Sequence, residues 1–307
     1  MGGAIAQEEQ EEETVPSPDQ PDQPEHPDGL DRSAPAAPSA LAAPPAPPAL
    51  AAPPAPPVRA AADRAGSPPV GGAGLWLLRV PEVAVGALAV GELDQDERAR
   101  TDAFVRDSDR VRYAAAHIAL RRLLGSATGM PARELVMVRE PCPCCGALHG
   151  RPALAVRPGA EQPGRLPHFS LSHGGDLILI GLADVPIGVD VEALPEPRTV
   201  TELAAVLHPG EQRELSGVPA ELRTAAFARL WTRKEAYLKG IGTGLGRDPA
   251  ADYLGSGGLA PTPPGWTVAD LDLARDEAEG HAAAYALRHD SAAAPRLRRL
   301  PVDAVLG

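Results

Sequence analysis

The sequence predicts an α+β fold in which two similar subdomains follow a disordered tail. Residues 1–70 hold 17 of the 36 prolines and almost no bulky apolar side chains, so they cannot build a core. Residues 71–185 and 186–290 then each combine one long helical pattern with several short apolar runs. We therefore expect two subdomains that meet near Val185, with residues 291–307 as a C-terminal tail.

The first subdomain is expected to combine one long helix with short strands. Residues 74–80 contain the apolar run Leu-Trp-Leu-Leu and predict a first strand. Residues 94–124 predict a single helix that Gly125 ends. Further strands are expected at 134–138, 168–171 and 177–182, and a Pro/Cys/Gly loop runs to about Pro152 before the second of these.

The second subdomain has the stronger helical signals. Residues 187–191 predict a buried strand, which Asp184-Val185-Pro186 separates from the strand before it. Late strands are expected to close the fold. The helices cover 199–207, 209–215 and 219–238, and the late strands cover 266–273 and 281–287.

Charge and cysteine usage exclude several classes of protein. The formal charge is -12, and the 11 acids and three arginines of residues 1–70 account for -8 of it. A nucleic-acid-binding face needs dense Lys and Arg, which the mildly acidic remainder lacks. The Ala-Pro blocks cannot form a membrane helix, and three crowded cysteines do not make a disulfide framework. We therefore expect a cytoplasmic protein without a nucleic-acid or membrane partner.

Asp190 and Glu192 are a candidate pair of metal ligands. They are two residues apart on a predicted strand, so both carboxylates lie on one face. Val189 and Val191 then point into the core from the other face. An exposed strand end with two solvated acids would give the same pattern, so the pair alone does not establish a site.

The 219–238 helix carries a second candidate group that extends just past its predicted end. Trp231, Glu235 and Lys239 are spaced by four and share one stripe. The chain has 27 arginines but only two lysines, Lys234 and Lys239, which indicates a place where a flexible ammonium is needed. An ordinary surface Glu/Lys pair is the alternative, worth about 0.2–0.5 kcal/mol. The tryptophan on the same stripe favours a partly covered site.

A third group lies in Phe169-Ser-Leu-Ser-His-Gly-Gly-Asp176, where a strand is expected to end in a glycine-rich turn. Such a turn can direct backbone N–H groups, a hydroxyl and an imidazole at a phosphate. Ser172 and His173 are adjacent on a strand and face opposite sides, which argues against a Ser-His nucleophile pair. Phosphate binding is the interpretation we favour.

Four motifs, taken together and in their order along the chain, resemble the surfactin-synthetase-activating type of 4′-phosphopantetheinyl transferase over roughly residues 75–287. The resemblance implies two α+β halves related by a pseudo-twofold, with coenzyme A and Mg²⁺, or Mn²⁺, in the cleft between them. It also implies transfer of phosphopantetheine from coenzyme A to a serine of an apo acyl or peptidyl carrier protein. Two subdomains in one chain can complete the cleft without a second copy, so a monomer is expected. The motifs are Gly150-Arg-Pro152, Phe169-Ser-Leu-Ser-His173, Gly188-Val-Asp-Val-Glu192 and Trp231-Thr-Arg-Lys-Glu-Ala-Tyr-Leu-Lys239.

The resemblance assigns roles to individual residues. Asp190, Glu192 and Glu235 match the family's metal-site acids, in keeping with the preference of Mg²⁺ for carboxylate, water and phosphate oxygens. Glu235 also matches the acid proposed to take the proton from the carrier serine. Lys239 matches a lysine near the pyrophosphate, where it would offset charge on the departing adenosine 3′,5′-bisphosphate.

Further positions match contacts to coenzyme A. Ser172 and His173 resemble phosphate contacts, and Arg112 resembles a basic residue near the 3′-phosphate, with Arg98 or Arg100 assisting. The roles of Glu211 and Lys234 stay open. The loop against the adenine end corresponds to Gly150, Arg151 and Pro152, with arginine where the family often has lysine.

Two other functions compete with this reading. A Mg²⁺-dependent phosphatase or nuclease, that is, a phosphoester hydrolase, would also gather carboxylates around a metal. A zinc-binding interaction module is suggested by Cys142-Pro-Cys-Cys-Gly-Ala-Leu-His149. Zinc needs four well-placed ligands, Cys144 and Cys145 are adjacent, and no second Cys/His pair is near, so a plain loop is preferred.

Overall fold

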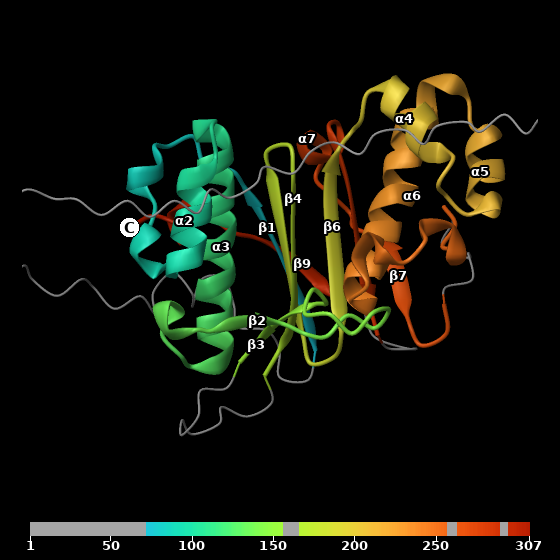
Figure 1. Cartoon of the computed structure of the whole chain (residues 1–307). Coiled ribbons are helices and arrows are strands. Elements are labelled where there is room, and N and C mark those ends of the chain that lie inside the picture. The colour runs from blue at the N-terminus through green and yellow to red at the C-terminus, as the bar shows by residue number, and fades with distance from the viewer. Residues whose placement is uncertain (1–71, 156–165, 257–262, 289–293) are drawn as a thin grey trace, which may run out of the picture. The chain divides into compact units, whose positions relative to one another are not determined.

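Two sheets pack face to face, and one 22-residue helix covers the outer face of each (Figure 1). The computed structural model describes residues 72–155, 166–256, 263–288 and 294–307. The expected tail at residues 1–70 lies outside them. The predicted α+β class is confirmed.

The first sheet has four strands in the order β4-β5-β1-β9. The central strand β5 pairs antiparallel with both β4 and β1, whereas β9 pairs parallel with β1. The strand β4 extends three residues past its predicted end and includes Ser172 and His173, so the glycine-rich turn begins only at Gly175. The bounds are β1 Ala73–Arg79, β4 His168–Gly174, β5 Leu177–Ala183 and β9 Arg296–Arg299.

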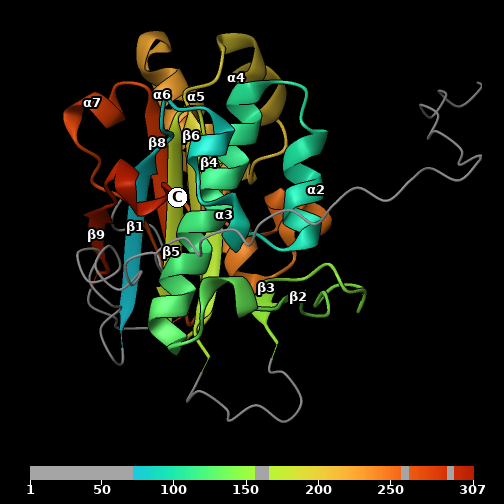
Figure 2. The same cartoon turned by 90° about the vertical axis from the view of Figure 1, so that its left-hand side faces the viewer.

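The helix expected at 94–124 is instead two helices, α2 (Gln95–Ala103) and α3 (Asp107–Thr128). Phe104 interrupts it, because this residue is extended and its ring packs 5.4 Å from that of Tyr113. The predicted stop at Gly125 is also wrong, since α3 runs on to the left-handed Gly129. Figure 2 shows α3 in front of the first sheet, with which it forms the first core.

A short ribbon follows α3. The strand expected at 134–138 is shifted, because residues 132–134 form a 3-10 helix and β2 covers Met137–Arg139. Pro152, expected near the end of a loop, begins a strand that the sequence did not indicate, β3 (Pro152–Leu154). The two strands pair antiparallel and carry the loop 140–151 between them.

The second sheet has the order β6-β8-β7, all antiparallel. Its outer face packs on α6, and its inner face shares a core with the first sheet through Val189 and Val191, both fully buried. A Cβ on Gly188 would lie 1.9 Å from the carbonyl oxygen of Ala236, so α6 touches the backbone of β6. The bounds are β6 Ile187–Ala193, β7 Thr267–Asp270, β8 His281–Leu287, α4 Pro197–Ala204, α5 Pro209–Ser216, α6 Ala220–Ile241 and α7 Arg275–Ala278.

The edges of the two sheets meet along β4 and β6 without a ladder of main-chain hydrogen bonds. Small side chains on β4 allow the close approach: Ser170 Oγ accepts a hydrogen bond from Val189 N at 3.1 Å. A Cβ on Gly174 would lie 2.4 Å from the carbonyl oxygen of Val191. This seam brings Ser172 of the first half against Asp190 of the second.

The C-terminal segment is not the tail we expected at 291–307. Beyond residue 293 it adds β9 to the first sheet, and Leu300 and Val305 are buried in the core with α3. The chain passes from the first sheet to the second at residues 184–186, where the boundary was placed. The described residues nevertheless belong to one compact unit, so the division into subdomains stays a prediction. None of their helices is long and apolar enough to cross a bilayer.

Candidate active site

The centre of the candidate site is Asp190, which is fully buried on β6. Its Oδ1 accepts hydrogen bonds from Ser172 Oγ at 2.7 Å and from Lys239 Nζ at 2.6 Å. Its Oδ2 is also buried but has no hydrogen-bond partner among the described residues. A buried carboxylate oxygen without a protein partner is costly in a folded protein, so Asp190 Oδ2 is a position where a cation or a water can bind.

Lys239 connects the two halves at this point. It lies in the last turn of α6, and its ammonium also donates to Ser172 Oγ at 2.9 Å. It does not pair along the helix with Glu235, which removes the surface Glu/Lys alternative. Its side chain is 30% exposed, so the ammonium is partly open to a ligand.

Glu192 and Glu235 complete an acidic group around Asp190. Burial and then the Asp190 carboxylate raise the pKa of Glu192 to about 7. Burial and Asp190 likewise raise the pKa of Glu235, and the Lys239 ammonium opposes both shifts. Three carboxylates therefore share one ammonium, and the Asp190 charge disfavours ionisation of both glutamates.

This group fits a divalent cation chemically. Its oxygen donors are the ligands that Mg²⁺ prefers, and the partnerless Asp190 Oδ2 and the raised pKa values show an uncompensated negative charge. The three carboxylates do not form a preassembled metal site, because their oxygen atoms do not all lie within 4.8 Å of one another. In the part of the chain that the structure describes, the group of three with all ligand atoms within 4.8 Å of one another is a different one.

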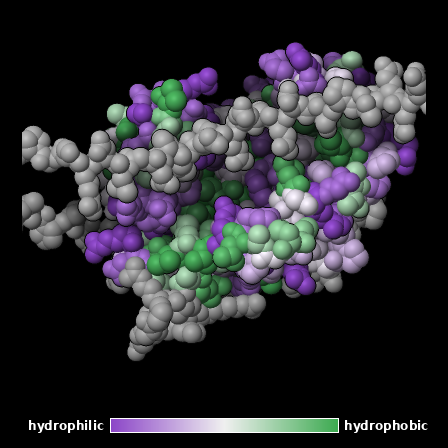
Figure 3. All heavy atoms as spheres, in the orientation of Figure 1, coloured by the Kyte–Doolittle hydropathy of each residue, from purple (hydrophilic) through white to green (hydrophobic). Residues whose placement is uncertain are grey.

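A cavity of about 990 Å³ adjoins Lys239 and is lined by α2, α3, the β2–β3 ribbon and the end of α6. Figure 3 shows a hollow on this face with hydrophilic and hydrophobic side chains around it. The predicted residues Gly150, Arg151 and Pro152 form one wall. The cavity is therefore bounded by both halves of the fold.

Comparison with known proteins agrees with this geometry. The model of the 4′-phosphopantetheinyl transferase superfamily matches residues 186–281. A phosphopantetheinyl transferase of Thraustochytrium sp. is 30% identical over 262 residues, which cover 73% of this chain and 83% of that protein.

The chain belongs to the 4′-phosphopantetheinyl transferase superfamily.

Other relatives align over shorter stretches. The 4′-phosphopantetheinyl transferase HetI of Nostoc sp. is 31% identical over 194 residues, covering 62% of this chain and 75% of HetI. The protein slr0495 of Synechocystis sp. is 33% identical over 155 residues, covering 50% of this chain and 58% of slr0495. The chain thus spans little more than half of slr0495.

In this member of the superfamily, Arg151 braces the wall of the cavity. Its guanidinium donates twice to the Glu140 carboxylate, at 3.0 and 2.7 Å, and once to the Gly240 carbonyl at 3.1 Å. These bonds tie the loop 140–151 to the end of α6. A Cβ on the left-handed Gly242 would lie 2.8 Å from Arg151 Cγ, so the glycine permits this packing.

His173 and Arg112 form a separate group from Arg151. His173 is exposed on the opposite face of β4 from Ser172, as the strand period predicted. Partial desolvation and then the Arg112 charge lower the pKa of His173, with Lys239 adding to the effect. Arg112 ion-pairs with Asp109 at 3.3 Å, and its Nε is buried without a partner in the described part of the chain.

Trp231, Glu235 and Lys239 are all half-buried, as their shared stripe predicted, but the expectation that the two lysines mark one place is wrong. Trp231 stacks on Phe227, with ring centroids 5.9 Å apart, and packs against the core of α4 and α5. Lys234 is 1% exposed and donates to Glu211 Oε1 at 2.9 Å, so the two lysines do not share a site. Lys234 and Glu211 are a structural pair that joins α5 to α6.

Sequence reasoning missed a polar network in the cavity wall. Glu97 accepts from Arg121 Nε at 2.6 Å and lies 2.8 Å from His117 Nδ1. Asp94 caps α2 in a capping box with Glu97. The Asp-x-x-Glu spacing was a readable signal for that helix start. The partner Arg121 was hidden among 27 arginines.

Proposed function

We propose that this chain is a transferase of the surfactin-synthetase-activating type. In this proposal it moves the 4′-phosphopantetheine group of coenzyme A to a serine of an apo acyl or peptidyl carrier protein. The observation that carries the proposal is the buried Asp190, whose free Oδ2 lies among two further acids and one lysine beside a cavity. The superfamily match covers the segment that holds these four residues.

Asp190, Glu192 and Glu235 would hold Mg²⁺, with Mn²⁺ as an alternative. A divalent cation bound there supplies charge stabilisation to a pyrophosphate. The chain's own contribution is to keep the acids in a desolvated setting at the seam. Ser172 and Lys239 support this by fixing the position of Asp190 Oδ1.

Glu235 would accept the proton of the carrier serine. A proton acceptor must be ionised, and a cation held by the same acids would favour the ionised form of this carboxylate. The serine oxygen then forms a bond to the β-phosphorus while the bond to the leaving oxygen breaks. Lys239 would offset the charge on the departing adenosine 3′,5′-bisphosphate, because it both lines the cavity and reaches the acids.

The cavity would take coenzyme A. Arg151 lies on its wall in the Gly150–Pro152 segment, where a fixed guanidinium favours an anionic or planar group. Ser172, His173 and Arg112 would contact phosphates. A neutral His173 with a lowered pKa could donate or accept a hydrogen bond there.

The test is the intact mass of an apo acyl carrier protein incubated with this protein, coenzyme A and Mg²⁺. We expect a gain of one phosphopantetheine mass that EDTA abolishes. Glu235→Gln should lower the rate by about 100-fold or more. Glu221→Gln is the matched control, because Glu221 is exposed at the start of the same helix. Transfer at the normal rate by Glu235→Gln would refute the role of this residue.

The hydrolase alternative makes a different prediction in the same assay. A phosphoester hydrolase would release inorganic phosphate from simple esters without a carrier protein. No mass gain with several unrelated carriers, together with such release, would replace the transferase proposal.

We propose a cytoplasmic location as well, since carrier proteins and reduced thiols are found together there.

A further inference from the structure

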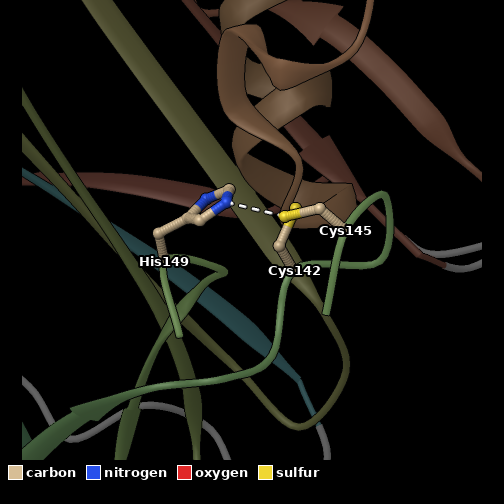
Figure 4. A group of neighbouring side chains, drawn as sticks. All are labelled: Cys142, Cys145 and His149. Atoms are coloured by element: carbon tan, nitrogen blue, oxygen red, sulfur yellow. Dashed lines mark hydrogen bonds between the residues drawn. The ribbon is translucent and has the colours of Figure 1, made fainter. Parts of the chain in front are cut away.

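The loop between β2 and β3 gathers three side chains that can bind a soft metal ion. Cys142, Cys145 and His149 point toward one another (Figure 4), and their ligand atoms all lie within 4.8 Å. Cys145 Sγ is 3.0 Å from His149 Nε2. Across the described residues, this is the group of three that meets that distance, and the proposed transfer reaction does not use it.

The backbone of this loop holds the three residues in place. Gly146 N donates to the Cys142 carbonyl at 2.8 Å, and Cys142 N donates back across the turn to the Ala147 carbonyl at 2.8 Å. Gly146 follows the second cysteine in the left-handed conformation, at φ 76°. Such a turn brings the side chains of a Cys-x-x-Cys pair to the same side. Backbone bonds thus preform the loop before any ion binds.

We propose that Cys142, Cys145 and His149 bind one Zn²⁺ ion. The spacing Cys-x2-Cys-x3-His and the two thiolates with one imidazole are the donor set and compact geometry that zinc takes in proteins. Ligands about 2.0–2.3 Å from a tetrahedral zinc lie roughly 3.5–3.8 Å apart, so small side-chain rotations suffice here. Cys144 is exposed and outside the group, so the chain supplies three of the four ligands that zinc needs and a water would be the fourth. The convergence of the three side chains, which their spacing did not reveal, favours this site over the plain loop.

The ion would act on the wall of the large cavity, and this part of the inference rests on the proposed function. The loop is closed at its base by Glu140 N to the Arg151 carbonyl and Gly150 N to the Glu140 carbonyl, each at 2.9 Å. Residues 148–152 of this loop and of β3 line the cavity. Zinc at the tip would therefore hold the Arg151 wall in one position, as a positioning site distinct from the acidic Mg²⁺ site.

The first experiment measures metal content without any activity assay. The full chain is purified without a His tag from zinc-supplemented cells under reducing conditions. The zinc content per chain is then measured by inductively coupled plasma mass spectrometry. We expect one zinc per chain in the wild type and in Cys144→Ser, and strong loss in Cys142→Ser and His149→Ala. His149 is exposed, so His149→Ala should fold even where the buried Cys142→Ser does not.

Three outcomes would overturn the site. These are a wild type with less than about a tenth of an equivalent of zinc, a His149→Ala variant that keeps its zinc, and a Cys142–Cys145 disulfide in protein isolated under reducing conditions. Cobalt titration gives a second readout, because tetrahedral thiolate-bound Co²⁺ absorbs strongly in the visible range, whereas Co²⁺ bound by carboxylate and water oxygens would absorb only weakly. The band should appear in the wild type and be absent in His149→Ala.

A separate experiment tests the positioning role. Zinc is stripped with a chelator, which is then removed, and transfer is assayed with excess Mg²⁺. We expect the KM for coenzyme A to rise severalfold while kcat changes little, and re-added zinc should restore the KM. An unchanged KM would refute positioning. If no form of the protein transfers phosphopantetheine, the proposed function fails, but the zinc content still decides the site.

Discussion

Replacing Lys234 by methionine should destabilise the fold strongly. The Lys234 ammonium donates to Glu211 Oε1 at 2.9 Å and to the Asp252 carbonyl, and both partners of the ion pair are buried, at 1% and 0% exposed. Methionine fills the space of the lysine stem but leaves the Glu211 carboxylate without its counter-charge. Removing one partner of a buried ion pair costs about 3–5 kcal/mol.

The lower end of that range should apply here. Glu211 keeps two hydrogen bonds from backbone N–H groups, those of His208 at 3.0 Å and Leu254 at 2.8 Å, which offset part of its charge. A loss of about 3 kcal/mol corresponds to roughly 6–12 °C in melting temperature for a domain of this size. Adding Glu211→Gln to Lys234→Met should recover about 1 kcal/mol or more, because the uncompensated charge is then removed.

Thermal unfolding followed by circular dichroism measures these changes. Arg229→Met is the matched control, since it removes a cation from an exposed position of α6 and should shift the melting temperature by little. The reasoning is refuted if Lys234→Met melts within about 1 °C of the wild type. A variant that is fully stable but inactive would instead place Lys234 in the reaction.

Three further changes test other parts of the fold. Gly188→Ala should destabilise by several kcal/mol, because the new Cβ would lie 1.9 Å from a carbonyl oxygen of α6, whereas Gly91→Ala meets nothing within 4 Å and serves as the control in the same urea titration. Burial would raise the pKa of Glu97, but the hydrogen bonds to this carboxylate outweigh burial and lower the pKa. The ionised carboxylate therefore stabilises the fold fully at pH values above the ordinary pKa of about 4.3, and this stabilisation is lost as the pH falls further. The difference in unfolding free energy between wild type and Glu97→Gln should therefore shrink from pH 6 to pH 4, and a constant difference would contradict the assignment. Deleting residues 296–307 removes an edge strand and buried apolar side chains, and should leave a chain without cooperative thermal unfolding; a sharp transition at the wild-type temperature would show the segment to be dispensable.

Local patterns predicted most of the strands and helices because their signals lie within short windows. The apolar run of β8 and the period of α6 are examples, and both elements lie close to where they were expected. The break at Phe104 was missed because it depends on an aromatic contact with Tyr113, which the period of the surrounding residues does not reveal. The strand β9, Arg-Leu-Arg-Arg, is too polar for a pattern search and exists because β1 offers it an edge.

For the candidate site, the sequence placed Asp190 on one face of its strand and Ser172 opposite His173, and the structure agrees. It could not predict that Lys239 reaches across to Asp190, because that contact depends on where α6 crosses β6. The chain has only two lysines, and this scarcity wrongly suggested that Lys234 belongs to the same site as Lys239. One ammonium lies at the seam of the two sheets and the other neutralises a buried carboxylate elsewhere on α6.

The place of β9 beside β1 has a consequence for how the chain is made. The ribosome releases β1 early, but its parallel neighbour is the last of the described strands to be synthesised, roughly 10–40 s later at 5–20 residues per second. Until then one edge of β1 stays unpaired, and the apolar side chains of the first core that Leu300 and Val305 cover stay open to water. We expect the half of the protein that is translated first to be completed last, so nascent chains arrested near residue 290 should be cleaved by protease within that half.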